Sequence, residues 1–139
     1  MTKVILVAHG KLAYEMKNSA EMIFGKLGDF YPIAFTTKDG FDSLKEKITK
    51  TMDILDGSIL IITDLFAGTP FNASSALVME NDHKKIEVIS GMSLPLVLET
   101  ATMSKEKQPQ EIVEYLKSIS QDTVRNFVME EEDSEEDEL

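Results

Sequence analysis

The side chain best placed for chemistry in this sequence is the imidazole of His9. His9 follows the apolar run 4–8 and precedes Gly10, so a buried strand would deliver the imidazole to an exposed edge. When a carboxylate holds one ring nitrogen as a donor, the other nitrogen keeps its lone pair and is a nucleophile. Asp64 is the candidate carboxylate, because it directly follows a second apolar run at 58–63. The two residues together would form a nucleophilic pair.

The segment after Asp64 has the features of an anion site at a helix start. Thr69 before Pro70 indicates a helix whose N-cap is the Thr69 hydroxyl and whose first position is the proline. The unpaired amides and the dipole at such an end stabilise an anion, and the small residues at 67–68 let it approach the backbone. A phosphoryl group on His9 would then lie against this helix. The predicted phosphoryl-binding residues are Gly10, Gly68, Thr69, Phe71 and Asn72.

Strand and helix patterns alternate along the chain, and this alternation predicts how these residues are positioned. Apolar runs predict strands at 3–8, 30–35, 58–63 and 85–90, and spacings of three and four predict helices at 11–27, 41–55, 70–80, from about 94 to 103, and 111–118. The fold class is therefore α/β, a doubly wound, mainly parallel sheet of order 2-1-3-4 with helices on both faces. In that order strands 1 and 3 are neighbours, so His9 and Asp64 should face each other at the switch point.

Composition and charge restrict the class of protein. The 139 residues suit one domain, which we place at 1–129, followed by an acidic tail at 130–139 that we expect to be disordered. A net charge of -11 with a single arginine, Arg125, argues against binding to nucleic acid. There is no cysteine, and neither a signal peptide nor a membrane span is predicted, so we expect a cytoplasmic protein. No nucleotide-binding motif is present, and the sequence implies no cofactor and no metal.

Three segments together resemble a known family. Residues 7–10 read VAHG, residues 63–74 read TDLFAGTPFNAS, and residues 88–95 read VISGMSLP. Over about residues 2–128 the chain resembles the IIA component of the mannose family of the bacterial phosphoenolpyruvate-dependent sugar phosphotransferase system. The resemblance implies that His9 accepts a phosphoryl group from phospho-HPr, through Nε2, and passes it to a IIB component. It also implies that Asp64 holds Nδ1 and that the loop at Gly68 and Thr69 receives the phosphoryl oxygens.

The resemblance further implies an assembly. Such proteins serve sugar uptake through membrane subunits IIC and IID, and they form homodimers in which a C-terminal strand crosses to the partner's sheet as an antiparallel edge. The segment 126–129 is the candidate strand here. Ala67 and Thr69 stand where the family commonly has glycine and serine. No proline- and alanine-rich linker or IIB domain follows, so we expect a free-standing IIA protein.

Two alternatives remain beside this interpretation. The first is the phosphocarrier subunit of a dihydroxyacetone kinase, which shares the fold and takes the same phosphoryl group but serves a soluble kinase. The second is a non-catalytic flavodoxin-like binding or regulatory module. The other histidine, His83, lies in a predicted turn far from the switch point, and we expect it to be solvated without a role.

Overall fold

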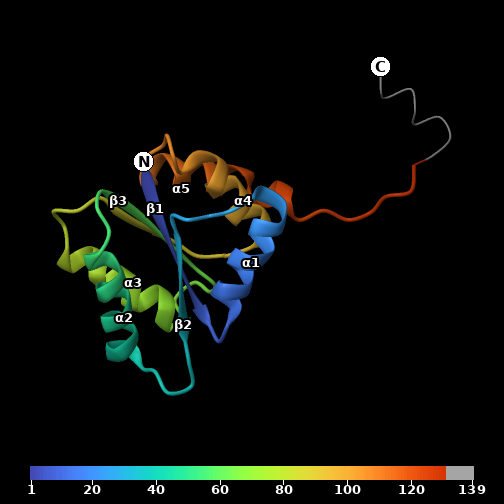
Figure 1. The fold of residues 1–139 in the computed structure, drawn as a ribbon. Coiled ribbons are helices and arrows are strands. Elements are labelled where there is room, and N and C mark those ends of the chain that lie inside the picture. Colours follow the sequence, from blue (N-terminus) through green and yellow to red (C-terminus); the bar gives the residue numbers. More distant parts are fainter. Residues whose placement is uncertain (131–139) are drawn as a thin grey trace.

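A parallel β-sheet delivers the carboxyl ends of all its strands to one edge of the molecule. The structure, a computed structural model, describes residues 1–130. Within them the sheet has the order β2-β1-β3-β4, as predicted, and every pairing is parallel (Figure 1). The strands are β1 (Thr2–His9), β2 (Phe30–Phe35), β3 (Ser58–Thr63) and β4 (Ile86–Ile89).

Helices cover both faces of this sheet. They are α1 (Leu12–Phe24), α2 (Phe41–Asp53), α3 (Thr69–Glu80), α4 (Leu94–Met103) and α5 (Pro109–Ile119), and a short 3-10 helix, η1 (Ser120–Thr123), follows. Two separate apolar clusters show which helices share a face. One cluster contains side chains of α1, α4 and α5, and the other contains side chains of α2 and α3. The first three helices accordingly lie on one face of the sheet and the other two on the opposite face (Figure 1). The doubly wound architecture is therefore confirmed.

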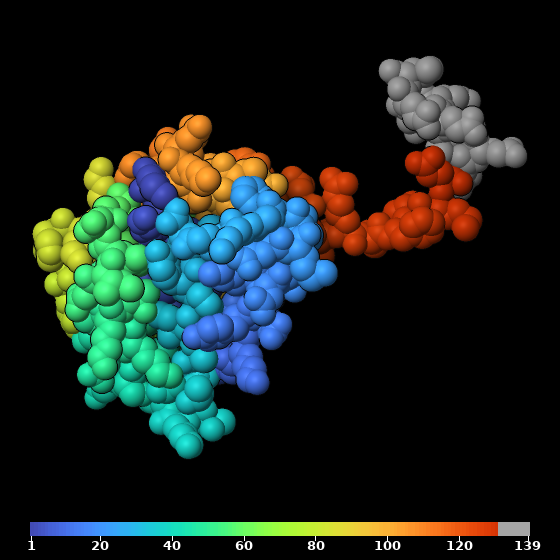
Figure 2. Space-filling model, viewed as in Figure 1, coloured from blue at the N-terminus to red at the C-terminus, as the bar shows by residue number. Residues whose placement is uncertain are grey.

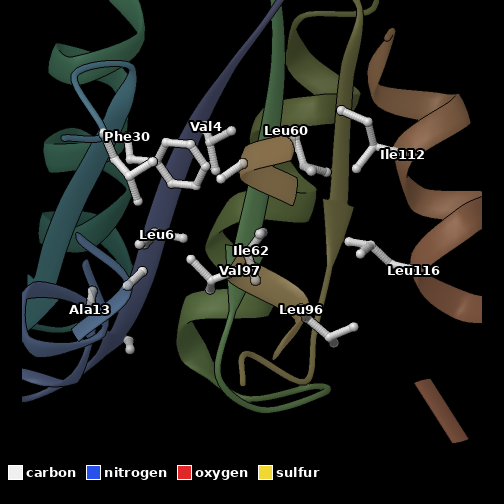
Figure 3. Close-up of a cluster of buried hydrophobic side chains, with 14 residues drawn as sticks. Val4, Leu6, Ala13, Phe30, Leu60, Ile62, Leu96, Val97, Ile112 and Leu116 are labelled. Carbon is white, nitrogen blue, oxygen red and sulfur yellow. The ribbon is translucent and has the colours of Figure 1, made fainter. Parts of the chain in front are cut away.

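The central strand β1 is apolar without alternation because it is buried on both faces. Val4 and Leu6 point into the cluster that also holds Val97 of α4 and Leu116 of α5 (Figure 3). Ile5 and Val7 point into the opposite cluster. All four side chains have no exposed surface. Burial of one such side chain stabilises the fold by about 1.5–3 kcal/mol, so β1 is a rigid support for the residue at its end.

The first helix ends earlier than the sequence predicts. The helical pattern predicts a helix as far as residue 27, but α1 ends at Phe24. Gly25 adopts φ 103°, a left-handed conformation that breaks the helix and that glycine takes without steric cost. The chain then turns toward β2.

The predicted C-terminal strand is not formed within the single chain. Residues 124–130 carry no regular secondary structure and leave the body of the molecule after η1 (Figures 1 and 2). A strand requires a neighbour for its backbone hydrogen bonds, and β4, at the end of the sheet, is paired only with β3. Phe127 and Val128 are accordingly exposed. Of the predicted acidic tail at 130–139, all but Glu130 lies outside the described residues.

Candidate functional site

His9 and Asp64 lie within hydrogen-bond distance at the carboxyl edge of the sheet. His9 Nδ1 is 2.8 Å from Asp64 Oδ2, and the same oxygen accepts the His9 backbone amide at 3.0 Å. The other carboxylate oxygen accepts the Leu65 amide at 3.0 Å. The His9 side chain is 48% exposed and that of Asp64 only 9%. The carboxylate is thus fixed by three donors, while the imidazole stays open to solvent.

Strand register explains this pairing. Val7 on β1 lies opposite Thr63 on β3, so Asp64 is the next residue beyond that pair. Parallel neighbours are about 4.8 Å apart, which lets side chains at adjacent strand ends meet directly. The sequence prediction that the two residues face each other at the switch point therefore agrees with the geometry.

The surroundings of Asp64 determine which ring nitrogen of His9 carries the proton. Burial is the largest single effect on Asp64 and raises its pKa, but the hydrogen bonds from the His9 amide and ring and the His9 charge together lower it by more. The net result is a pKa below the ordinary value, so the group is a carboxylate at neutral pH. A carboxylate can only accept a hydrogen bond. Nδ1 of His9 is therefore the donor, and Nε2 carries the lone pair.

The loop between Asp64 and α3 lies directly against the imidazole. A Cβ added to Gly68 would stand 3.9 Å from Cε1 of His9, so the loop backbone passes one side of the ring. Ala67 has φ 64°, a left-handed conformation that costs a residue with a Cβ roughly 1–2 kcal/mol. The loop thus holds a strained residue next to the predicted anion site.

The start of α3 differs from the prediction by one residue. Gly68 is the N-cap, in an extended conformation, and Thr69 is already helical, so the predicted capping by the Thr69 hydroxyl is wrong. The reason is that the Gly68 carbonyl accepts the Asn72 amide at 2.8 Å, which starts the helical hydrogen bonds one residue earlier. Pro70 still stands in the first turn, where no amide hydrogen is needed. The amides of Thr69 and Phe71 come before the helical ladder and remain suited to an anion.

Two of the predicted phosphoryl-binding residues also support the loop. The Asn72 side-chain amide donates to the Ala67 carbonyl at 3.2 Å, and this bond braces the strained residue. The Phe71 ring packs on the Phe66 ring with centroids 4.9 Å apart. Phe66 is nevertheless 75% exposed, and it stands at the rim of the site. Contact of Asn72 and Phe71 with a phosphoryl group stays a prediction.

Gly10 follows His9 on the side of β2. It adopts φ 60°, turns the chain from β1 into α1, and donates its amide to the Phe35 carbonyl at 2.9 Å. A groove of about 640 Å³ opens there between α1 and the end of β2, and its lining includes Gly10, Tyr14 and Thr36. His9 therefore lies beside a concave surface.

The second histidine lies far from this site. His83 is exposed in the turn after α3, at the opposite edge of the sheet from His9. Among residues 1–130 no cluster of three or more histidine or acidic side chains could hold a metal ion. None of the helices in this range has the length and apolar character needed to cross a membrane.

One neighbour of His9 was not predicted. The Phe35 ring lies perpendicular to the imidazole, with ring centroids 5.2 Å apart and an interplanar angle of 88°. The predicted strand order could have indicated this neighbour, because β2 also lies next to β1 and Phe35 is the last residue of β2. His9 is thus flanked by Asp64 on one side and Phe35 on the other.

Comparison with known proteins relates this chain to components of the phosphotransferase system. Residues 3–117 match the family model EIIA-man, described as "PTS system fructose IIA component". The sorbose-specific EIIA component of Lacticaseibacillus casei is 40% identical over 121 residues, which cover 86% of each chain.

Solved structures of the same class have the same fold. A phosphotransferase system component EIIA from Streptococcus agalactiae is 31% identical, with a TM-score of 0.82 over 91% of this chain and 98% of its own. A mannose/sorbose specific IIA subunit from Enterococcus faecalis is 28% identical, with a TM-score of 0.84 over 94% of this chain and 97% of its own.

Proposed function

This chain belongs to the mannose family of phosphotransferase-system IIA components, and we propose that His9 is the residue that carries its phosphoryl group. As a member of this family, the protein is a phosphoryl carrier in sugar uptake and has the activity of a phosphotransferase component. The observation that supports His9 is its 2.8 Å contact with Asp64 through Nδ1, which leaves Nε2 outside this bond on a side chain that is 48% exposed. The relatives named for sorbose uptake favour this role over service to a dihydroxyacetone kinase.

In the proposed reaction, Nε2 of His9 attacks the phosphorus atom of the donor. A nitrogen–phosphorus bond forms while the donor's bond to phosphorus breaks, and the electron pair of that bond stays with the donor. The proton on Nδ1 remains, so the imidazole becomes cationic while it carries the phosphoryl group. Asp64 stabilises this positive ring through Nδ1. Transfer onward reverses the same steps on the acceptor.

The start of α3 would stabilise the phosphoryl oxygens. Gly68, which lies beside His9 Cε1, is the N-cap of α3, so the amides of Thr69 and Phe71 and the positive end of the helix dipole begin next to the imidazole. Gly10 keeps the opposite side free of a side chain. Phosphoryl transfer depends mainly on such positioning and charge stabilisation, so the site needs no further catalytic group.

We assign phospho-HPr as the donor and a IIB component as the acceptor. Both would have to approach His9 from the exposed carboxyl edge of the sheet, where the groove beside Gly10 and the exposed Phe66 provide a contact surface. Coupling to membrane subunits IIC and IID would complete uptake, which puts this component in the cytoplasm.

We also propose a homodimer. The open edge of β4 borders two hollows, one of about 750 Å³ that includes Ile86 and Pro109, and one of about 470 Å³ that includes Val88 and Leu116. The exposed apolar segment 126–129 has the composition to pair with this edge in a second copy.

Labelling with phosphoenolpyruvate, enzyme I and HPr tests the site. With ³²P-labelled phosphoenolpyruvate, the wild-type protein should be labelled and His9→Ala should remain unlabelled, because the nucleophile is lost. His83→Ala is the matched control and should be labelled as the wild type is, since His83 is the only other histidine. Labelling of His9→Ala, or loss of labelling in His83→Ala alone, would refute the assignment.

A further inference from the structure

The contact between His9 and Asp64 does not by itself fix the orientation of the imidazole ring. A hydrogen bond at Nδ1 fixes the position of one ring atom, but the ring can still tilt about that bond. The Gly68 loop borders the ring near Cε1, but the His9 side chain is still 48% exposed, so the loop alone leaves the ring open on its other side. Yet the direction of Nε2, on which the phosphoryl group would be carried, depends on the tilt. A second contact is needed to define the plane of the ring.

Phe35 supplies such a contact from the opposite strand. It lies directly opposite His9 in the register of β1 and β2, while Asp64 reaches His9 from β3. The two rings are perpendicular at 88°, with centroids 5.2 Å apart, which is a preferred geometry for aromatic pairs. His9 is therefore held between a polar contact on one side and an aromatic contact on the other.

The position of Phe35 is itself fixed by hydrogen bonds on both sides. Its carbonyl accepts the Gly10 amide at 2.9 Å, which ties it to the turn that follows His9. The preceding carbonyl, of Ala34, accepts Lys47 Nζ at 3.0 Å. The following residue, Thr36, donates its amide to Asp39 at 2.8 Å. Phe35 is also partly buried against the apolar cluster under α2 and α3. The Phe35 ring is therefore held in place and can restrict the movement of the imidazole.

We propose that Phe35 is a positioning residue, which holds the imidazole plane of His9 so that Nδ1 stays on Asp64 and Nε2 points outward. Its effect on phosphoryl transfer rests on the proposed role of His9, but its effect on the ring does not. Phe35 would contact neither the donor phosphorus nor the phosphoryl oxygens, and it would act only through the orientation of His9.

The test compares Phe35→Leu with Tyr31→Leu. Tyr31 lies four residues earlier on β2 and packs against the same apolar cluster, so its replacement removes a similar aromatic contact away from His9. Two quantities are measured in each variant: the ¹⁵N shifts of the His9 ring in the unphosphorylated protein, and the single-turnover rate of phosphorylation at saturating phospho-HPr.

Phe35→Leu should reduce the population of the Nδ1–H tautomer and slow phosphorylation about threefold to tenfold. Its half-saturating phospho-HPr concentration should be unchanged. Phe35→Tyr, which restores the ring, should stay within about twofold of the wild type. Phe35→Met, in which a flexible chain replaces the ring, should behave like the leucine variant and serves if that variant fails to fold. Tyr31→Leu should alter neither quantity.

Wild-type ring shifts and rates in both ringless variants would overturn the proposal. Equal losses in Tyr31→Leu would also overturn it, because they would indicate general destabilisation. If phospho-HPr fails to label the wild-type protein, the proposed function fails, but the ¹⁵N shifts still decide whether Phe35 orients His9.

Discussion

At the scale of single residues, Asp64 has two roles toward His9, and one substitution can test both of them without changing the shape of the side chain. Its carboxylate selects the tautomer of His9 and would balance the positive ring of the phosphorylated state. Asp64→Asn keeps the shape but removes the charge, so we expect phosphorylation by phospho-HPr to slow about 10- to 100-fold. The phosphohistidine should also hydrolyse faster, and quenched-flow labelling and a chase without donor measure the two rates.

The control for this change is Asp56→Asn. Asp56 is an exposed acid in the loop before β3, at the other edge of the sheet, and its replacement changes the net charge by the same amount. It should leave both rates unaltered. Equal transfer rates in Asp64→Asn and the wild type would remove Asp64 from the mechanism.

Gly68 is the second residue whose size we expect to matter. The space beside it accepts one carbon, because an added Cβ would be 3.6 Å from the Leu65 Cβ and 3.9 Å from His9 Cε1, which are ordinary contacts. Gly68→Ala should therefore fold and transfer nearly as the wild type does. The two additional methyl groups of Gly68→Val would crowd the ring and the phosphoryl site, so its phosphorylation rate should fall at least about tenfold.

Far-UV circular dichroism separates this effect from unfolding. Gly68 has φ -84°, which any residue can adopt, so both variants should keep the wild-type spectrum. A valine variant that is folded and phosphorylated at the wild-type rate would show that the loop does not confine the group.

At the scale of elements, the loop between β2 and α2 depends on one carboxylate. Asp39 accepts hydrogen bonds from Lys47, from the Thr36 amide and hydroxyl, and from the Ser43 hydroxyl. These contacts, the one with Lys47 first, hold the pKa of Asp39 far below its ordinary value of 3.8. A depressed pKa in the folded state means that the ionised group stabilises the fold above pH 4 and that this stabilisation is lost as the pH falls further.

Asp39→Asn should therefore unfold at lower urea concentration than the wild type at pH 7 and at pH 5. The difference should narrow below pH 4, because Asp39 of the unfolded chain then takes up a proton while the contacts of the folded protein keep this carboxylate ionised, which favours unfolding of the wild type. Asp82→Asn, at an exposed turn position, is the control, and its urea midpoint should differ little from that of the wild type at every pH. If the urea midpoints of Asp39→Asn and the wild type differ by the same amount down to pH 2, the ionised Asp39 carboxylate is not the source of the difference in stability.

The arrangement of elements was predictable where one local pattern decided the outcome. Continuous apolar runs identified β1 and β3, and the common strand order then placed His9 beside Asp64. The cap of α3 was not predictable, because Thr69 is an equally good first helical residue once the Gly68 carbonyl takes the Asn72 amide. Phe35 was missed because its contact with His9 comes from the register of β2 and not from its own neighbours in sequence.

At the scale of the whole molecule, the C-terminal segment shows why a pattern can predict a strand that one chain does not form. Phe127, Val128 and Met129 have strand-like composition but are 86%, 67% and 80% exposed. Apolar side chains in such a row are usually covered in solution by a partner surface. The open edge of β4, with its two flanking hollows, offers backbone groups and apolar contacts of the kind the segment lacks. The single chain therefore contains both surfaces that would meet in the proposed dimer, the segment 126–129 and the edge of β4, and they do not contact each other within it.

This complementarity predicts the oligomeric state. In light scattering after size exclusion, the wild-type protein at micromolar concentration should have twice the chain mass of 15.6 kDa. Phe127→Asp puts a charge into the apolar contact and should weaken association by at least about 2 kcal/mol, roughly 30-fold in the dissociation constant. Met22→Asp is the control, because Met22 is 87% exposed on α1, which packs against β1, β2 and α4 and not β4. It should remain dimeric. A monomeric wild type, or a Phe127→Asp variant as dimeric as the control, would exclude pairing through this segment.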